Sequence, residues 1–109
     1  MRRHDARIIQ MDYSKREAEE GIARRINEAY TLYSQAFEHL EIERKNVQLA
    51  EENYAVVRNR FENQLALLTD MLDASTARLN AGVRLVNARI ATLFYYYQLH
   101  YIAGTLTSL

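Results

Sequence analysis

The chain lacks several residue types that end helices or cross-link proteins. Its 109 residues include no cysteine, no proline and no tryptophan, and the only glycines are Gly21, Gly82 and Gly104. The absence of cysteine excludes disulfides and thiolate metal ligands, and it leaves the redox compartment unreadable from the sequence. Because helix breakers are scarce and Ala, Leu, Glu, Arg and Gln are plentiful, the composition predicts an all-α fold of long helices.

The chain also has no excess of charge of either sign, because 14 Lys and Arg residues balance 14 Asp and Glu residues. Such a chain has no electrostatic attraction for nucleic acid or for an anionic membrane, so neither is expected as a partner. No apolar run approaches the roughly 20 residues that span a bilayer, and no signal-peptide core follows the charged N-terminal segment. The chain itself is therefore predicted to be soluble and to carry no targeting signal.

Motifs of catalysis and metal binding are missing as well. The histidines, His4, His39 and His100, lie far apart in the sequence, and none has a carboxylate at ligand spacing on the same face. The sequence contains no Ser/His/Asp or Cys/His arrangement and no glycine-rich phosphate loop. We therefore expect no metal, no cofactor and no enzymatic activity.

Apolar residues in the first part of the chain repeat with the period of a coiled coil. The steps of four and three residues, about 3.5 on average, predict one long helix from about 2 to 61. The positions of this row are Ile22, Ile26, Ala29, Tyr33, Ala36, Leu40, Glu43, Val47, Ala50, Tyr54, Val57 and Phe61.

A second helix is predicted from about 67 to 102, after a turn at 62–66 in which Asn63 adopts the left-handed conformation that ends a helix. The product is a long antiparallel hairpin or coiled coil, with Gly104 as a plausible C-terminal cap. A further apolar row, Val83, Ile90, Phe94 and Tyr101, predicts that the second helix touches more than one neighbour. Its predicted packing row is Leu68, Leu72, Ser75, Leu79, Gly82, Val86, Leu93 and Tyr97.

The first predicted helix is longer than the second by roughly twenty residues, from the element lengths that the two patterns give. The residues before about Glu20, including Ile8, Ile9, Met11 and Tyr13, then have no partner within a closed hairpin. Two arrangements remain open. Either the chain folds back near Gly21 as a third short N-terminal helix, or another chain covers this segment.

Asp70 and Asp73 stand out inside the apolar run "NQLALLTDMLDAS" because residues three apart share a helix face, where like charges repel. The ordinary interpretation is that both lie near the start of the second helix, where the helix dipole favours negative charge. That effect is worth some tenths of a kcal/mol and needs no further function.

The segment from "AEENY" through "TDMLDAS" and "VNARI" to "GTL" resembles the C-terminal repeat of the TolC family of outer-membrane efflux channels, over about residues 20–109. The family pattern combines an aromatic residue, a short tip turn and an ordered series of small, apolar and acidic positions. The matching residues are Leu68, Asp70, Leu72, Asp73, Ala74, Leu79, Ala81, Asn87, Ala88, Leu99, Gly104, Thr105 and Leu106.

The resemblance implies a fragment of an α-helical tunnel. In the family, three protomers form a periplasmic tunnel below an outer-membrane β-barrel, which in a Gram-negative cell works with a periplasmic adaptor and an inner-membrane pump. The barrel strands and the first repeat are missing here, and the isolated fragment is expected to self-associate. The parent protein would be a passive exit duct for drugs or other small molecules.

The resemblance also assigns roles to residues near the turn. Asp70 and Asp73 would line the pore near its periplasmic end, and three copies would form stacked acidic rings about 4.5 Å apart, at 1.5 Å per residue. The tip would dock the adaptor through Phe61, Asn63, Gln64, Leu65, Ala66 and Leu67.

The sequence departs from the family at the tip, where some members carry a Tyr and an Arg that lock the closed entrance. Phe61 and Ala66 occupy those positions here, so neither the hydroxyl nor the guanidinium is present.

The alternative from another class is a soluble structural coiled coil or adaptor helical bundle, in which both aspartates would be ordinary surface charges. An enzyme is disfavoured, since a two-helix rod offers no pocket.

Overall fold

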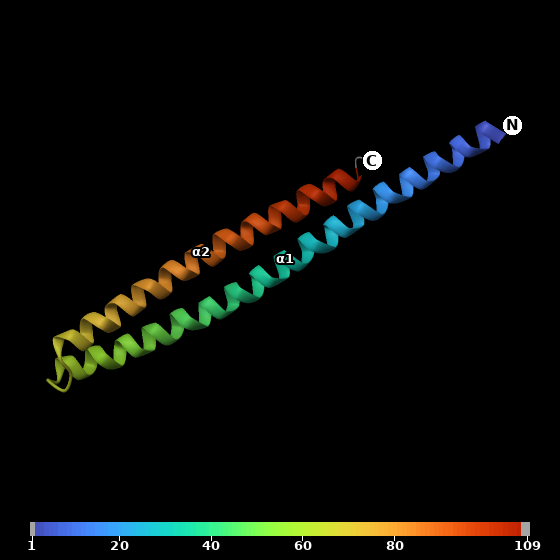
Figure 1. The fold of residues 1–109 in the computed structure, drawn as a ribbon. Coiled ribbons are helices and arrows are strands. Elements are labelled where there is room, and N and C mark those ends of the chain that lie inside the picture. The colour runs from blue at the N-terminus through green and yellow to red at the C-terminus, as the bar shows by residue number, and fades with distance from the viewer. Residues whose placement is uncertain (1, 108–109) are drawn as a thin grey trace. The chain divides into compact units, whose positions relative to one another are not determined.

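The computed structural model describes the backbone of residues 2–107, and the side chains of residues 6–104. The described residues form two helices, α1 (Arg2–Glu62) and α2 (Leu68–Thr107), and include no strand. Five residues, 63–67, join the helices. The predicted all-α helical hairpin is therefore confirmed (Figure 1).

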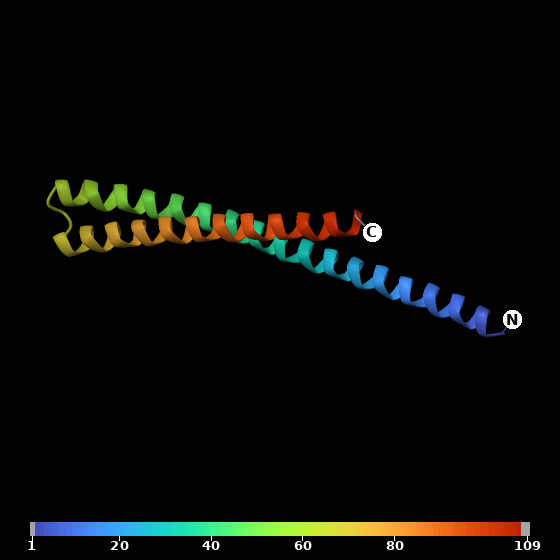
Figure 2. The same cartoon turned by 90° about the horizontal axis from the view of Figure 1, so that it is seen from above.

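The helices divide into two compact units. Residues 34–94 form the unit that contains the turn, and in it the two helix segments lie side by side (Figure 2). The other unit contains the remaining parts of both helices, with Tyr33 and Tyr96 in contact at a ring-centroid distance of 5.8 Å. Within that unit, the Tyr96 ring also packs edge-on against Tyr97 and His100, at 5.7 and 4.4 Å.

The burial pattern of α1 follows the row predicted for it from Ile22 to Phe61, which we call the α1 seam. From Ile22 to Val57, every position of the α1 seam is buried or half-buried, while Phe61 at its end is exposed. The seam includes Ala29 and Leu40, two of the most buried residues of the hairpin, and also a buried carboxylate, Glu43. A 3.5-residue period therefore identified the packed side of this helix.

The predicted packing row of α2 is wrong except at Gly82, which is half-buried, because its other members are exposed. Leu72, Leu79, Val86 and Leu93 each remain more than half exposed, and so do Val83 and Ile90 of the second predicted row. The side of α2 that is covered carries mostly small side chains, and we call it the packed face. Within the turn-containing unit it consists of Met71, Ala74, Ala81, Leu85, Ala88 and Thr92.

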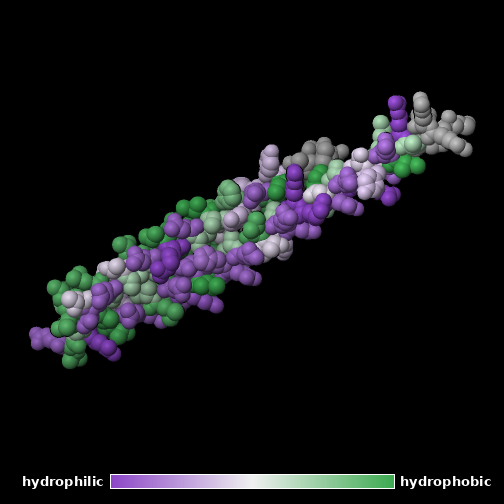
Figure 3. All heavy atoms as spheres, in the orientation of Figure 1, coloured by the Kyte–Doolittle hydropathy of each residue, from purple (hydrophilic) through white to green (hydrophobic). Residues whose placement is uncertain are grey.

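The physical reason is that α2 carries two rows with nearly the same 3.5-residue spacing, so the spacing alone does not decide which of them packs against α1. The bulkier row is left in solvent. We call it the apolar stripe: Leu72, Leu79, Val83, Val86, Ile90 and Leu93. Hydrophobic side chains are visible on the surface around the turn and along α2 (Figure 3).

Two expectations for the helix ends also need correction. The backbone of α1 is helical without interruption through Gly21, so the described chain has no third short N-terminal helix. As expected for a segment without a partner, Ile8, Ile9, Met11 and Tyr13 are exposed. Gly104 lies inside α2 and does not cap it, because α2 continues to Thr107. A single glycine costs a helix only about 1 kcal/mol relative to alanine, which neighbouring turns can absorb.

Candidate functional site at the hairpin tip

The turn between the helices is closed by backbone hydrogen bonds. The N–H of Leu65 donates to the carbonyl oxygen of Arg60 at 2.7 Å, and the N–H of Gln64 donates to that of Phe61 at 3.0 Å. This pair of bonds is the Schellman motif, in which the residue after the last helical cap is left-handed. That residue is Gln64, whose φ is 60°.

The prediction that Asn63 supplies the left-handed residue is therefore wrong. Asn63 instead directly follows the last residue of α1, and its side-chain amide donates to the carbonyl oxygen of Asn59 at 2.8 Å and lies 2.9 Å from the Asn59 side-chain oxygen. These bonds retain Asn63 one position before the sharp turn. Gln64 then takes the strained conformation, which costs an L-residue with a Cβ about 1–2 kcal/mol.

The residues predicted to form a docking tip lie together around this turn. Leu65 and Leu67 are 78% and 70% exposed, which is unusual for leucines in a packed turn. Phe61, Asn63 and Gln64 are also exposed, whereas Ala66 is half-buried. The tip is thus a small surface with protruding apolar side chains and no charged group between Asn63 and Leu67.

Asp70 organises the start of α2. Its carboxylate accepts a hydrogen bond at 3.0 Å from the backbone N–H of Leu67, the residue just before the helix. This bond satisfies one of the unpaired N–H groups of the helix N-terminus, as the acidic residue of a capping box does. The first helical bond follows, from the N–H of Met71 to the carbonyl oxygen of Leu67 at 3.2 Å.

Asp73 lies beside Asp70 in a groove next to the turn. The groove has a volume of about 530 Å³, and both carboxylates line it together with Arg60 and Asn53 of α1. Both aspartates are exposed, and the described residues provide no ion-pair partner for Asp73. The structure therefore brings the two predicted carboxylates to one solvated groove, with one guanidinium among its lining groups.

A different groove, of about 680 Å³, borders the apolar stripe. It is lined by Leu79, Val83 and Val86 of the stripe, and by Arg78. Arg78 reaches α1, where its guanidinium lies 4.7 Å from the centre of the Tyr54 ring and 4.0 Å from the Glu51 carboxylate. A two-helix rod was expected to offer no pocket, but the hairpin has these two surface grooves, each open to solvent.

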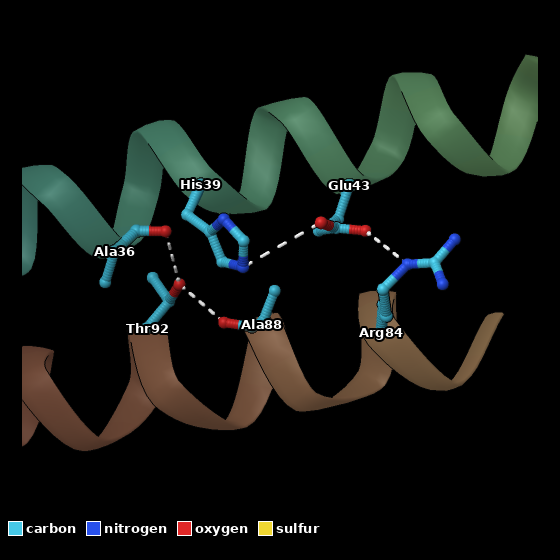
Figure 4. A network of polar contacts seen from close by, with 6 residues as sticks. All are labelled: Ala36, His39, Glu43, Arg84, Ala88 and Thr92. Carbon is cyan, nitrogen blue, oxygen red and sulfur yellow. Dashed lines mark hydrogen bonds and ion pairs between the residues drawn. The ribbon is translucent and has the colours of Figure 1, made fainter. Parts of the chain in front are cut away.

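Two sets of polar contacts join α1 and α2 at the packed face, one around Glu43 and one around Thr92 (Figure 4). The sequence indicated Glu43 as a polar residue in an apolar row, but it did not indicate Arg84 or Thr92. One carboxylate oxygen of Glu43 lies 3.4 Å from Nε of Arg84 on α2, and the other lies 3.9 Å from Nε2 of His39. His39 and Glu43 are four residues apart on α1, so the expectation that no histidine has a carboxylate on its own helix face is wrong. The Thr92 hydroxyl shares its proton between the carbonyl oxygens of Ala88, at 2.8 Å, and Ala36, at 3.2 Å. Glu43 was visible in the sequence as a charged residue within an apolar row. Its partner Arg84 is not, because their contact depends on how the two helices pair.

Within the described residues, no group of three or more His, Asp or Glu side chains is arranged to hold a metal ion. Neither helix, over that same range, combines the length and the hydrophobicity needed to cross a membrane. Comparison of the chain with protein-family models, with curated proteins and with solved structures found no match.

Proposed function

We propose that the chain is a periplasmic tunnel segment of a TolC-like outer-membrane efflux channel subunit. The proposal rests on the ordered motif resemblance over about residues 20–109 and on the hairpin fold, which such a segment requires. In this role the parent protein is a passive exit duct of a Gram-negative bacterium and catalyses no reaction. The hairpin supplies wall helices and a tip.

The observation that carries the proposal is the division of α2 into separate faces. The packed face lies against α1, Asp73 borders the groove near the turn, and Leu79 belongs to the apolar stripe. At 100° per residue, Asp73 and Leu79 point about 120° apart around the helix. A wall helix of a tube needs such a division, because it meets its own partner, the water of the duct and a neighbouring subunit.

The solvated carboxylates fit the duct side of this arrangement. In three copies, Asp70 and Asp73 would contribute rings of negative charge that favour cations over anions. Asp73 is the better candidate for this role, because Asp70 already accepts the hydrogen bond from Leu67. Charges that stay in water avoid the desolvation cost that a dry interior would impose on them.

The other two surfaces fit the proposed partners. The apolar stripe would be covered by neighbouring helices of the homotrimer, since side chains of this size favour burial by about 25 cal/mol per Å² of apolar area. The exposed Leu65 and Leu67 at the tip would meet the helical hairpin of a periplasmic adaptor, which in turn connects to an inner-membrane pump.

The direct test is ion selectivity of the protein encoded by the complete reading frame, reconstituted in a planar lipid bilayer. We expect Asp73→Asn to lower the permeability ratio of cations to anions several-fold. The matched control, Glu52→Gln, removes a charge from an exposed position on α1 and should leave this ratio unchanged. Equal ratios for Asp73→Asn and the unmodified protein would contradict the duct role of Asp73.

The second candidate is a soluble structural coiled coil or adaptor bundle. It is favoured by the hydrogen bond from Leu67 to Asp70, which gives that aspartate an ordinary structural role. A reading frame that begins at Met1, with a chain that remains monomeric at high concentration in light scattering, would support this alternative and contradict the channel proposal.

A further inference from the structure

Either the apolar stripe or the packed face of α2 could lie against α1, and the hydrophobic effect alone does not explain why the packed face does. The apolar stripe offers six large side chains, each between 51% and 67% exposed, whereas three of the six residues of the packed face are alanines. Burial of the stripe against α1 would remove more apolar surface from water. Some feature of the hairpin must therefore favour the smaller face.

We propose that the ion pair between Glu43 and Arg84 selects which face of α2 packs against α1, and so keeps the apolar stripe available on the surface. This inference does not depend on the proposed channel function, because it concerns only the pairing of the two helices within residues 34–94.

The buried carboxylate of Glu43 needs a cationic partner, and this need limits how α2 can pack. Glu43 is only 5% exposed and occupies a position of the α1 seam that apolar residues fill elsewhere. A buried carboxylate without a partner is strongly unfavourable, whereas a paired one is tolerated. Arg84 is the cation that α2 supplies: its Nε lies 3.4 Å from Oε2 of Glu43, which is an ion-pair distance without a hydrogen bond, while His39 comes from α1 itself.

The position of Arg84 around α2 explains how the packed face supplies this partner. At 100° per residue, Arg84 points about 60° from Ala81 on the packed face, but about 140° from Leu79 on the apolar stripe. Packing through Ala81 therefore lets the guanidinium reach across the helix boundary. Packing through Leu79 would turn Arg84 toward the far side of α2 and place Glu43 among aliphatic side chains.

Thr92 adds a second polar contact with the same preference. Its hydroxyl reaches the carbonyl oxygen of Ala36 on α1 at 3.2 Å. Because Leu93 is one residue further along, the stripe side of α2 points about 100° away from this hydroxyl. Rotation of α2 to bury Leu93 would therefore break the contact with Ala36 as well.

The experiment compares thiol labelling at two positions of α2, because the chain contains no natural cysteine. Leu79→Cys reports on the apolar stripe and Ala81→Cys on the packed face. In the otherwise unmodified chain, at a concentration where sedimentation gives a monomer, a maleimide should react at least tenfold faster at position 79. Each reporter is then combined with Glu43→Leu, which removes the need for Arg84.

If the ion pair selects the packed face, the labelling rate at position 79 divided by that at position 81 should fall at least tenfold in Glu43→Leu. The ratio should recover in the charge-swapped variant, Glu43→Arg with Arg84→Glu. Circular dichroism verifies that helix content is retained. If close packing of the alanines alone sets the face, the ratio stays within twofold in Glu43→Leu, and the proposal is overturned.

Glu43→Gln serves if the leucine variant loses its helices. The amide has nearly the same volume as the carboxylate but no charge to pair, so the labelling ratio should fall at least threefold. An unchanged ratio in this folded variant would equally overturn the proposal.

Discussion

The packed sides of α1 and α2 are built on different principles. On α1 the covered row contains Leu40 and other large residues, and its bulk and its 3.5-residue spacing coincide. On α2 the most buried residues of the covered row are Ala74, Ala81 and Ala88, while Leu79 and the other large side chains of the apolar stripe remain in solvent. The larger apolar row of a helix is thus not always the row that packs within its own chain.

In the proposed homotrimer, the two helices would therefore have different numbers of neighbours. A helix that packs on one side only needs a single apolar row, as in a simple amphipathic helix. A helix with a small-residue face against one partner and a large-residue stripe elsewhere is suited to contacts on two sides. Substitutions at covered positions should therefore lower the free energy of unfolding more than substitutions at exposed positions of the same helix.

The largest expected effect is at Leu40, which is 6% exposed in the α1 seam. Leu40→Ala removes buried methyl groups and leaves a cavity, so it should lower the free energy of unfolding by about 2–4 kcal/mol. Leu49→Ala, at a 62% exposed position of the same helix, should change it by less than about 0.5 kcal/mol. Urea unfolding followed by circular dichroism measures both values, and equal losses would contradict the assigned side of α1.

The corresponding test on α2 uses an addition of volume. Ala81 is 1% exposed, so Ala81→Leu should overpack the helix boundary and destabilise the hairpin by about 1–3 kcal/mol. The paired variant Leu79→Ala removes a mostly exposed side chain and should cost less than about 0.5 kcal/mol in the monomer. A neutral or stabilising Ala81→Leu would show that this face of α2 is not packed against α1.

The two aspartates should differ in their structural contribution. Asp70→Ala removes the acceptor for the Leu67 N–H and a favourable charge at the helix start, which should cost about 1 kcal/mol of unfolding free energy. Asp73→Ala loses only a helix-dipole interaction, of about 0.3 kcal/mol. Thermal unfolding of both variants distinguishes these values. An equal loss would mean that the bond to Leu67 is not a stabilising feature of the tip.

The smallest expected effect is a gain. Gln64→Gly relieves the positive φ of 60° in the turn and should stabilise the hairpin by about 0.5–1 kcal/mol. Asn63→Gly has the opposite sign, because it removes the side-chain bond to the Asn59 carbonyl oxygen and increases the conformational freedom of the unfolded chain. Denaturant midpoints for the two variants should therefore lie on opposite sides of the unmodified chain. If both substitutions stabilise, the assignment of the left-handed residue is wrong.

The sequence was sufficient to predict the features of this fold that depend on local patterns. The scarcity of breakers predicted the helices, and the α1 seam was visible because a single apolar row dominates that helix. The predicted turn at 62–66 and the five joining residues observed at 63–67 differ by one position. Asp70 and Asp73 were placed near the start of α2, and α2 begins at Leu68.

The remaining features depend on how the helices pair. Two rows of α2 share one period, and spacing alone does not decide between Leu79 and Ala81. The choice of Gln64 over Asn63 in the turn follows from hydrogen bonds that Asn63 makes with Asn59. The partner of Glu43 lies 41 positions away in the sequence, at Arg84, and becomes a neighbour only once the hairpin has closed.

The most direct measurement is a nitroxide scan of α2 from residue 71 to 93, with one introduced cysteine per variant and oxygen accessibility measured by electron paramagnetic resonance in the monomer. Accessibility should oscillate along the helix, with maxima at Leu72, Leu79, Val86 and Leu93 and minima at Ala74, Ala81 and Ala88. The opposite phase, with protected positions at Leu79 and Val86, would contradict the claim that α2 packs through its small-residue face and leaves its apolar stripe for a partner.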